Sequence, residues 1–377
     1  MIEIVFWISI AFIFYAYLGY PLALQLLNMF RSYPVVKGDI EPQVSFIIAA
    51  HNEELRIGAK IDNTLAQAYP AGKLEIIIAS DCSTDRTDEI VKSYASQGVR
   101  LIRASERKGK EAAQKLAVQE AKGGILVFSD VATILLESGV RNIVRNFSDL
   151  TVGCVSSVDR LVNQDGRIGG EGAYVKYEMF LRSLESRVNS LVGLSGSFFA
   201  ARTEVCQNWP VNLQSDFNTL LNSIRMGLRG VSDPESVGYY KNISDERREF
   251  ERKVRTVLRG ISVFMSSLFI LNPVKYGLIS WQLFSHKLCR WLVPFAMIIV
   301  FVSNLGLLAA SQLYVLTFLL QLVLYALAII GCTSLGHYGR SALKIPAFFV
   351  IVNVSILSAW FRYLRGERMV SWKPSER

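Results

Sequence analysis

The sequence predicts an α/β protein in which a doubly wound sheet domain is followed and preceded by apolar α-helical segments. Residues 43 to about 240 alternate strand-like with helix-like segments, which is typical of a sheet built from βαβ units. Residues 4–30 carry no charged side chain, and apolar runs recur from residue 261 onward. With 51% hydrophobic and 19% charged residues, the chain is too apolar for an ordinary soluble protein and too charged for a channel.

Residues 1–30 are predicted to form an N-terminal transmembrane helix. A secretory signal has a basic leader and a short apolar core, whereas this stretch begins with Glu3 and is longer. Arg31 and Lys37 follow it, and positive charge beside a span marks the cytoplasmic side. We therefore expect residues 31–240 to form a cytoplasmic domain at an inner or plasma membrane.

The first half of that domain has a regular local pattern. Strands are expected at Val44–Ala50, Leu74–Ser80, Val99–Arg103 and Ile125–Ser129, with helices at about 53–68, 83–97 and 110–121. This series is one half of a doubly wound sheet. It has no Gly-x-Gly-x-x-Gly after its first strand and no P-loop, which disfavours dinucleotide binding and ATPase activity.

The C-terminal part is predicted to be membrane-associated. Residues 241–290 read as basic and amphipathic interfacial helices, 291–361 as transmembrane helices, and 362–377 as a basic tail. The expected spans are about 292–310, 313–333 and 345–361. Three such spans would put the tail outside the cytoplasm, against the positive-inside rule. A re-entrant last segment, an additional span within 261–283 or a departure from the rule all remain open.

The distribution of charged residues and cysteines limits the kinds of partner and metal site that the chain is expected to have. The net charge is +9, and many of the basic residues flank apolar segments, which favours anionic lipid headgroups over nucleic acid. The five cysteines form no CxxC pair and the three histidines are scattered, which argues against a disulfide framework or a zinc site.

Three aspartates, Asp81, Asp130 and Asp216, each follow a short strand-like run. Open α/β sheets bind ligands at the carboxyl ends of their strands. Taken singly, Asp81 suits a turn and Asp216 suits a helix cap. Together with the basic loop at 107–110, the three acids favour a site for a metal-bound phosphate ligand.

This combination suits a nucleoside-diphosphate sugar. Its diphosphate leaving group needs charge neutralisation, which a divalent cation held by carboxylate oxygens provides. Lys108 and Lys110 would add positive charge near the phosphates, unless they form only a solvated basic loop. The incoming hydroxyl needs a carboxylate base on the opposite face of the sugar. We assign the metal side to Asp130 and the base to Asp216.

At these positions the sequence resembles the family 2 glycosyltransferases. The resemblance rests on segments that occur in the family's order, at Val44–Glu54, Ser80–Asp85, Arg107–Ala113, Val127–Asp130, Leu194–Arg202 and Gln214–Phe217. It covers about residues 43–260, and the later membrane segments are similar to the polysaccharide-synthase-like branch. It implies a GT-A fold with a Rossmann-like doubly wound mixed sheet, an inverting mechanism, a nucleoside-diphosphate sugar donor and Mg or Mn.

The resemblance also implies roles for single residues. Glu53 and Asp81 would contact the nucleoside, Asp130 the metal and diphosphate, Ser195, Gly196 and Ser197 the acceptor sugar, and Asp216 would be the general base. The expected activity is transfer to a lipid-linked or growing polysaccharide acceptor, in surface polysaccharide or glycolipid synthesis. Membrane lipids and other glycan-assembly proteins are the further expected partners.

Several motifs depart from the family pattern. Asp130 is followed by Val131 and Ala132, so the usual second metal-binding acid is absent. Ser215 replaces the acid before the base, and the Gln-x-x-Arg-Trp motif of processive enzymes is not found near 253–260. Single addition is therefore at least as well supported as processive synthesis. The alternative function is a catalytically weak partner or scaffold in a glycan-assembly complex. A transporter is disfavoured because more than half of the chain looks soluble.

Overall fold

The computed structural model describes residues 1–162, 173–241, 246–331 and 341–368. The chain divides into two compact units. The first comprises 1–27, 245–261 and 280–368, and the second comprises 28–244, 262–279 and 369–377. The tail beyond residue 368 and the expected end of a span at Thr333 lie outside the described residues.

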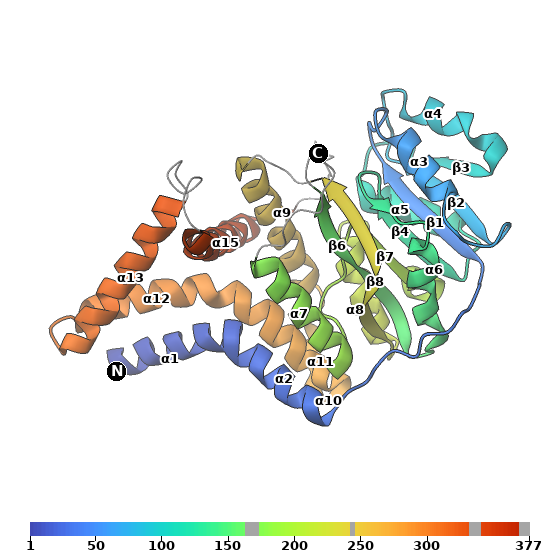
Figure 1. The fold of residues 1–377 in the computed structure, drawn as a ribbon. Coiled ribbons are helices and arrows are strands. Elements are labelled where there is room, and N and C mark those ends of the chain that lie inside the picture. The colour runs from blue at the N-terminus through green and yellow to red at the C-terminus, as the bar shows by residue number, and fades with distance from the viewer. Residues whose placement is uncertain (163–172, 242–245, 332–340, 369–377) are drawn as a thin grey trace. The chain divides into compact units, whose positions relative to one another are not determined.

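The second unit is built on an eight-stranded mixed sheet in the order β3-β2-β1-β4-β7-β6-β8-β5 (Figure 1). The strands are β1 (Val44–Ala50), β2 (Leu74–Ser80), β3 (Val99–Arg103), β4 (Ile125–Asp130), β5 (Ile134–Leu135), β6 (Val152–Val162), β7 (Phe198–Arg202) and β8 (Arg229–Lys241). The predicted α/β mixed sheet is confirmed.

The parallel half of the sheet carries the predicted strands. β1 lies between β2 and β4 and is buried along its whole length, which explains why all its residues except Ser45 are apolar. Ala50 pairs with Ser80, and Ala49 pairs with Asp130. The carboxyl ends of these three strands therefore meet at one edge of the sheet, as expected for a ligand site.

An antiparallel strand brings a distant segment to this edge. β7 runs antiparallel to β4, with Ser129 opposite Phe198. The Asp130 amide donates a hydrogen bond of 2.9 Å to the Ser197 carbonyl oxygen. Residues 195–197 consequently lie beside the end of β4, although about 65 residues of chain separate them.

Six helices connect the strands of this unit among its described residues. They are α3 (Ile57–Leu65), α4 (Thr87–Ser93), α5 (Lys110–Glu120), α6 (Gly139–Val144), α7 (Ala173–Val188) and α8 (Ser215–Arg225). α3 and α4 begin later than predicted because 51–56 and 81–86 form turns. The two turns are joined, since Asn52 Oδ1 accepts a 2.8 Å hydrogen bond from the Thr84 amide.

The strand-like run expected before Asp216 is wrong. Residues 210–214 form a turn in which the Leu213 amide donates to the Pro210 carbonyl at 3.2 Å. Asp216 instead occupies the first turn of α8, where the helix dipole favours an acidic side chain. Asp216 therefore enters the site from a helix rather than from a strand end.

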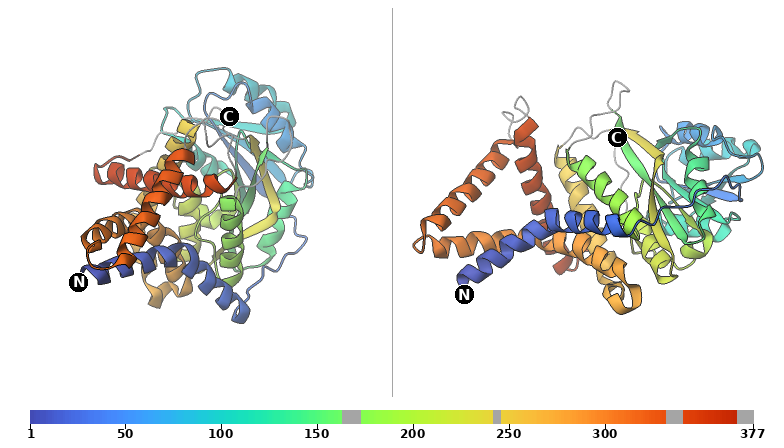
Figure 2. Two further views of the ribbon diagram at one scale, coloured as in Figure 1. Left: turned by 60° about the vertical axis from the view of Figure 1, so that its left-hand side comes forward. Right: turned by 60° about the horizontal axis from the view of Figure 1, so that its bottom comes forward.

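The first unit consists of apolar helices and the charged first part of the helix that begins at Glu246. They include α1 (Ile2–Phe14) and α2 (Tyr20–Phe30), joined by the π-helical turn η1 (Tyr15–Gly19), and α12 (Arg290–Leu307), α13 (Gln312–Gly331) and α15 (Ser341–Leu364). By length and composition, four stretches are able to cross a membrane: 2–30, 278–307, 312–331 and 345–364. α1 lies along α12, and α13 and α15 are in contact but diverge from one end (Figure 2).

The long helix containing α12 begins earlier than the sequence suggested. A span was expected from about residue 292, but α11 (Leu278–Leu283) continues through η6 (Phe284–Cys289) into α12. The polar residues Lys275, Gln282 and His286 interrupt the apolar run before residue 292, which favours an interfacial segment over a span. In the structure Gln282 and His286 are buried within the long helix, and Arg290 Nη1 lies 3.2 Å from His286 Nε2. The long helix is preceded in the chain by the 20-residue helix α9 (Glu246–Met265) and by the short helices η5 (Leu268–Leu271) and α10 (Pro273–Tyr276).

Candidate active site

The turns that follow β1 and β2 have an unusual backbone. Asn52 and Cys82 have φ angles of 52° and 54°, in the left-handed region that residues other than glycine rarely occupy. Asparagine tolerates this region better than cysteine does. The Asn52 amide donates to Ser83 Oγ at 3.2 Å, so each turn supports the other. Together the two turns form one wall of the site.

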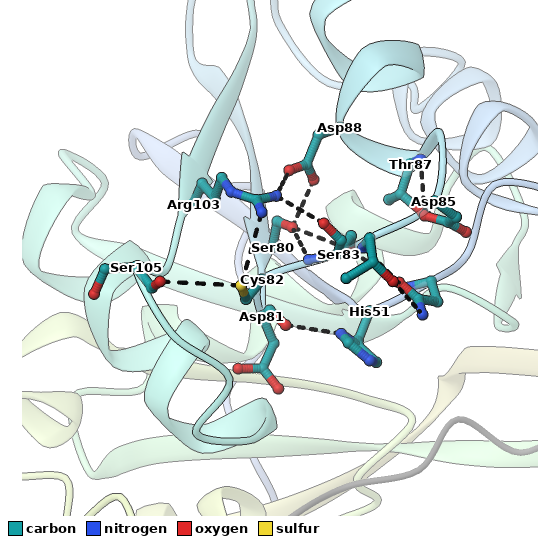
Figure 3. Close-up of polar contacts among 12 residues, drawn as sticks. His51, Ser80, Asp81, Cys82, Ser83, Asp85, Thr87, Asp88, Arg103 and Ser105 are labelled. Carbon is teal, nitrogen blue, oxygen red and sulfur yellow. Dashed lines mark hydrogen bonds and ion pairs between the residues drawn. The ribbon is translucent and has the colours of Figure 1, made fainter.

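A polar network behind this wall holds it in place (Figure 3). Ser80 Oγ donates to Asp88 Oδ1 at 2.6 Å, and Arg103 forms an ion pair with the same carboxylate. Arg103 also donates to the Ser83 carbonyl oxygen at 3.0 Å. His51 Nδ1 lies 2.7 Å from the Asp81 carbonyl oxygen. These bonds satisfy the buried polar groups of the turns and fix their backbone.

The Asp81 carboxylate points away from this network (Figure 3). Its Oδ1 accepts a hydrogen bond of 2.9 Å from the Lys108 amide, and its Oδ2 accepts one of 3.0 Å from the Gly109 amide. Gly109 has a φ of 98°, which explains the glycine of this loop. The predicted proximity of Asp81 and the 107–110 loop is therefore observed, with the carboxylate placed at the start of α5.

Glu53 lies on the same wall. Its side chain is buried, and Arg56 Nε donates to its Oε2 at 2.7 Å. Burial raises the pKa of Glu53, although the neighbouring Arg56 guanidinium opposes this shift.

Lys110 joins the end of β4 to the segment before β7. Its Nζ lies 2.5 Å from Asp130 Oδ1 and donates to the Gly196 carbonyl oxygen at 3.2 Å. Burial alone would lower the pKa of Lys110, but the Asp130 carboxylate outweighs burial and raises it. Lys110 is therefore a charged ammonium group inside the site.

Lys108 is placed differently from Lys110. Its side chain is exposed and its Nζ pairs with Glu106 on the same loop. The two lysines of the loop, which the sequence treated alike, therefore have separate surroundings.

Asp216 packs directly against Gly196. A Cβ atom on Gly196 would lie only 2.4 Å from Asp216 Oδ2, so residue 196 has no room for a side chain. Asp216 is buried, accepts a hydrogen bond of 2.6 Å from the Phe217 amide at Oδ1, and accepts one of 3.0 Å from Gln214 Nε2 at Oδ2. The predicted acceptor-side residue and the predicted base are thus in contact.

Two charged residues of the site were not predicted. Lys60 on α3 is fully buried, and its Nζ donates to Ser129 Oγ at 2.8 Å and to the Thr133 carbonyl oxygen at 2.6 Å. Burial lowers the pKa of Lys60 to about 7, although Asp130 opposes the shift. A lysine on the apolar stripe formed with Ile57 and Ile61 was the available signal.

The second unpredicted residue is Asp159 on β6. It accepts hydrogen bonds from Ser195 Oγ at 2.6 Å and from Ser197 Oγ at 2.5 Å. Aspartate is disfavoured inside strands, so an acid in the run Val152–Val162 was the only sequence signal.

Comparison with known proteins agrees with the motifs. Residues 45–208 match the family model described as Glycosyl transferase family 2. The beta-monoglucosyldiacylglycerol synthase of Synechocystis sp. is 27% identical over 177 residues, which are 44% of this chain and 37% of that protein. The Escherichia coli UDP-Glc:alpha-D-GlcNAc-diphosphoundecaprenol beta-1,3-glucosyltransferase WfaP is 37% identical over 87 residues, which are 23% of this chain and 34% of that protein. The matched regions thus span well under half of either relative.

A solved structure shares the fold over nearly the whole chain. The mannosyltransferase PcManGT of Pyrobaculum calidifontis, in complex with GDP-Man and Mn2+, superposes with a TM-score of 0.76 at 20% sequence identity. The alignment covers 98% of this chain and 100% of that chain. The matched residues 45–208 therefore form a glycosyl transferase family 2 domain, and the chain as a whole shares its fold with that mannosyltransferase.

Proposed function

We propose that this protein is a membrane-bound inverting glycosyltransferase that moves a sugar from a nucleoside-diphosphate sugar to a membrane-linked or growing glycan. The strongest support is the convergence of Lys110, Asp130 and Asp216 around Gly196. Lys110 Nζ bridges Asp130 Oδ1 and the Gly196 carbonyl oxygen at 2.5 and 3.2 Å, and Asp216 Oδ2 fills the space beside Gly196. The Lys110 ammonium group and the proposed base Asp216 therefore both contact Gly196.

The leaving-group side of the site centres on Asp130. Among the described residues, no three His, Cys, Asp or Glu side chains group closely enough to hold a metal ion. Mg²⁺ is commonly bound by one or two carboxylates together with substrate phosphates, so Asp130 fits a cation shared with a diphosphate. Such a cation, Mg or Mn, would neutralise the charge of the diphosphate when bound.

Lys110 supplies positive charge from the protein itself. Its ammonium group is buried next to Asp130, where a low effective dielectric strengthens its attraction for an anion. Glu53 and Asp81 line the wall that we assign to the nucleoside. The exposed Lys108 would contact the phosphates only at their outer edge.

The acceptor side centres on Asp216. We assign it as the general base that takes the proton of the incoming hydroxyl. Gly196, with Ser195 and Ser197 on either side, would contact the acceptor sugar. A single base is enough for direct displacement, which inverts the configuration at the sugar carbon.

The membrane assignment rests on the four apolar helical stretches. We place the sheet domain on the cytoplasmic side because positive charge follows the first of them. Arg31 supports this side more strongly than Lys37, whose Nζ is paired with Asp233 and Glu235 at 2.8 and 2.7 Å. A lipid-linked acceptor agrees with the diphosphoundecaprenol acceptor named for the Escherichia coli relative.

Nucleotide release tests this function. Protein in membranes is incubated with a panel of UDP- and GDP-sugars in Mg²⁺, in Mn²⁺ or in a chelator. We expect one nucleoside diphosphate to be released, at a rate that the chelator lowers. NMR of the product should show the anomeric configuration opposite to that of the donor. Asp216→Asn should lower the rate about 100-fold or more while donor binding is unchanged.

The outcomes distinguish the alternatives. If Asp216→Asn leaves nucleotide release intact, the base is another residue. If the wild-type protein binds no sugar nucleotide, the scaffold function replaces the enzymatic one. Retention of the donor's configuration would contradict the inverting mechanism.

A further inference from the structure

Asp159 forms the centre of a hydrogen-bonded clamp on residues 195–197. Its two carboxylate oxygens are used separately, because Oδ2 accepts from Ser195 Oγ at 2.6 Å and Oδ1 accepts from Ser197 Oγ at 2.5 Å. The two serine oxygens are themselves 2.9 Å apart. Hydrogen bonds to an ionised carboxylate are stronger than those between neutral groups, so this clamp is firm.

β6 holds the same segment at a second point. The Ser195 amide donates to Ser156 Oγ at 2.7 Å, and Arg182 donates to the same Ser156 hydroxyl. Ser157 Oγ donates to the Phe198 carbonyl oxygen at 2.6 Å. Side chains from one short stretch of β6 therefore bind both ends of the segment and leave Gly196 between them.

The opposite side of the segment meets the proposed chemistry. The Gly196 carbonyl oxygen accepts from Lys110, and its Cα lies against Asp216 Oδ2. Any displacement of Gly196 therefore changes the position of Lys110, of Asp216 or of both. Among the described residues, Asp159 forms no hydrogen bond or ion pair with Lys110 or Asp216, and its other partner is Ser157 Oγ at 3.5 Å. Its shortest contacts toward Gly196 run through Ser195 and Ser197.

We propose that Asp159 is a positioning residue, which orients Ser195 and Ser197 so that Gly196 keeps Lys110 and Asp216 in register for glycosyl transfer. This inference rests on the proposed function, since Asp216 serves there as the base. Misplacement of a reacting group by about 1 Å can lower a rate about 100-fold.

The kinetic test uses Asp159→Asn and Asp159→Ala. Asn keeps the volume and one oxygen acceptor, so we expect about a 10-fold loss of kcat for nucleotide release, against about 100-fold for Ala. The KM for the sugar nucleotide should change less than about 2-fold in both variants, because Asp159 lies on the acceptor side.

Asp233→Asn is the matched control. Like Asp159, Asp233 accepts from a serine hydroxyl, with Ser236 Oγ at 2.6 Å, but it is fully buried and also pairs with Lys37. It lies on β8, away from residues 195–197. We expect this variant to lower the melting temperature with kcat unchanged, which separates positioning from general destabilisation.

A double-mutant cycle tests the route through the serines. In the Ser195→Ala/Ser197→Ala background, Asp159→Asn should lower kcat by less than about 2-fold, because the two partners of the carboxylate within residues 195–197 are gone. Equal losses in both backgrounds would overturn the proposal, as would full kcat in Asp159→Ala.

Hydrogen exchange tests the clamp without any activity. In Asp159→Asn, the amides of residues 195–197 should exchange faster than in the wild-type protein, while those of β1 stay unchanged. Unchanged exchange at 195–197 would also overturn the proposal. If the wild-type protein releases no nucleotide from any donor, the proposed function fails, and the exchange experiment still decides whether Asp159 holds the segment.

Discussion

Gly196 and Asp216 are packed so closely that residue 196 must lack a side chain. A Cβ atom at this position would lie 2.4 Å from Asp216 Oδ2 and 3.4 Å from its Cγ. Asp216 is in turn held by the Phe217 amide and by Gln214, so it has little freedom to move aside. Asp216 can therefore hold this position only if residue 196 is glycine.

Gly196→Ala should impair catalysis more than folding. The methyl group displaces the Asp216 carboxylate, and we expect a loss of nucleotide release of at least about 10-fold, with a destabilisation of about 1–3 kcal/mol. Gly124→Ala is the control, because a Cβ there meets no atom within 4 Å. Activity and melting temperature are measured for both. A fully active Gly196→Ala enzyme would show that Asp216 is not the base in this position.

The two loop lysines should respond differently to removal of their charge. Lys110→Met leaves Asp130 without its ammonium partner and removes a buried positive charge, so kcat should fall about 100-fold or more. Lys108→Met removes an exposed charge paired with Glu106, and we expect less than about a 3-fold change. Steady-state kinetics with the sugar nucleotide compares the two. Equal effects would contradict a distinct role for Lys110.

Lys60 should make stability depend on pH. Its pKa is about 7 in the folded protein against 10.5 as the ordinary value, because burial disfavours the charged form. Between these two values the unfolded chain binds a proton that the folded chain does not, so the free energy of unfolding rises with pH. The destabilisation is complete below about pH 7 and is relieved as pH approaches 10.5.

Lys60→Met provides the comparison, since methionine is similar in length and carries no charge. The stability of the wild-type protein relative to this variant should increase by a few kcal/mol between about pH 7 and about pH 10. Melting temperatures across this range measure the change. A constant difference between the two proteins would mean that Lys60 keeps an ordinary pKa.

Arg229 should be irreplaceable by lysine. Its guanidinium donates to the Tyr33 carbonyl oxygen at 2.6 Å, to the Pro34 carbonyl oxygen at 3.2 Å and to Asp149 Oδ2 at 2.8 Å. A lysine ammonium cannot reproduce this planar set of donors, so Arg229→Lys should lower stability by about 2–4 kcal/mol. Arg86→Lys, at an exposed pair with Glu89, should change stability by less than about 0.5 kcal/mol. Equal melting temperatures would contradict this.

The site itself was predictable to different degrees. Asp81 and Asp130 were found because each ends a strand whose apolar run is visible in the sequence. The strand-like run expected before Asp216 is a turn, and Asp216 itself lies in the first turn of α8. Lys60 and Asp159 were missed, because their hydrogen-bond partners lie far away in the chain. The partners of Lys60 are 69 and 73 positions away, and those of Asp159 are 36 and 38 positions away.

The amino-acid sequence alone determined the α/β class, the strands of the parallel half and the apolar helices at each end. These features depend on periodicity and composition within short windows, which the chain carries locally. The tertiary structure decided which polar residues meet. Antiparallel pairing of β7 with β4 brings Gly196 to Asp130, and only then do Lys110, Asp216 and Asp159 find their partners. Such contacts depend on the pairing of distant strands, which no local pattern specifies.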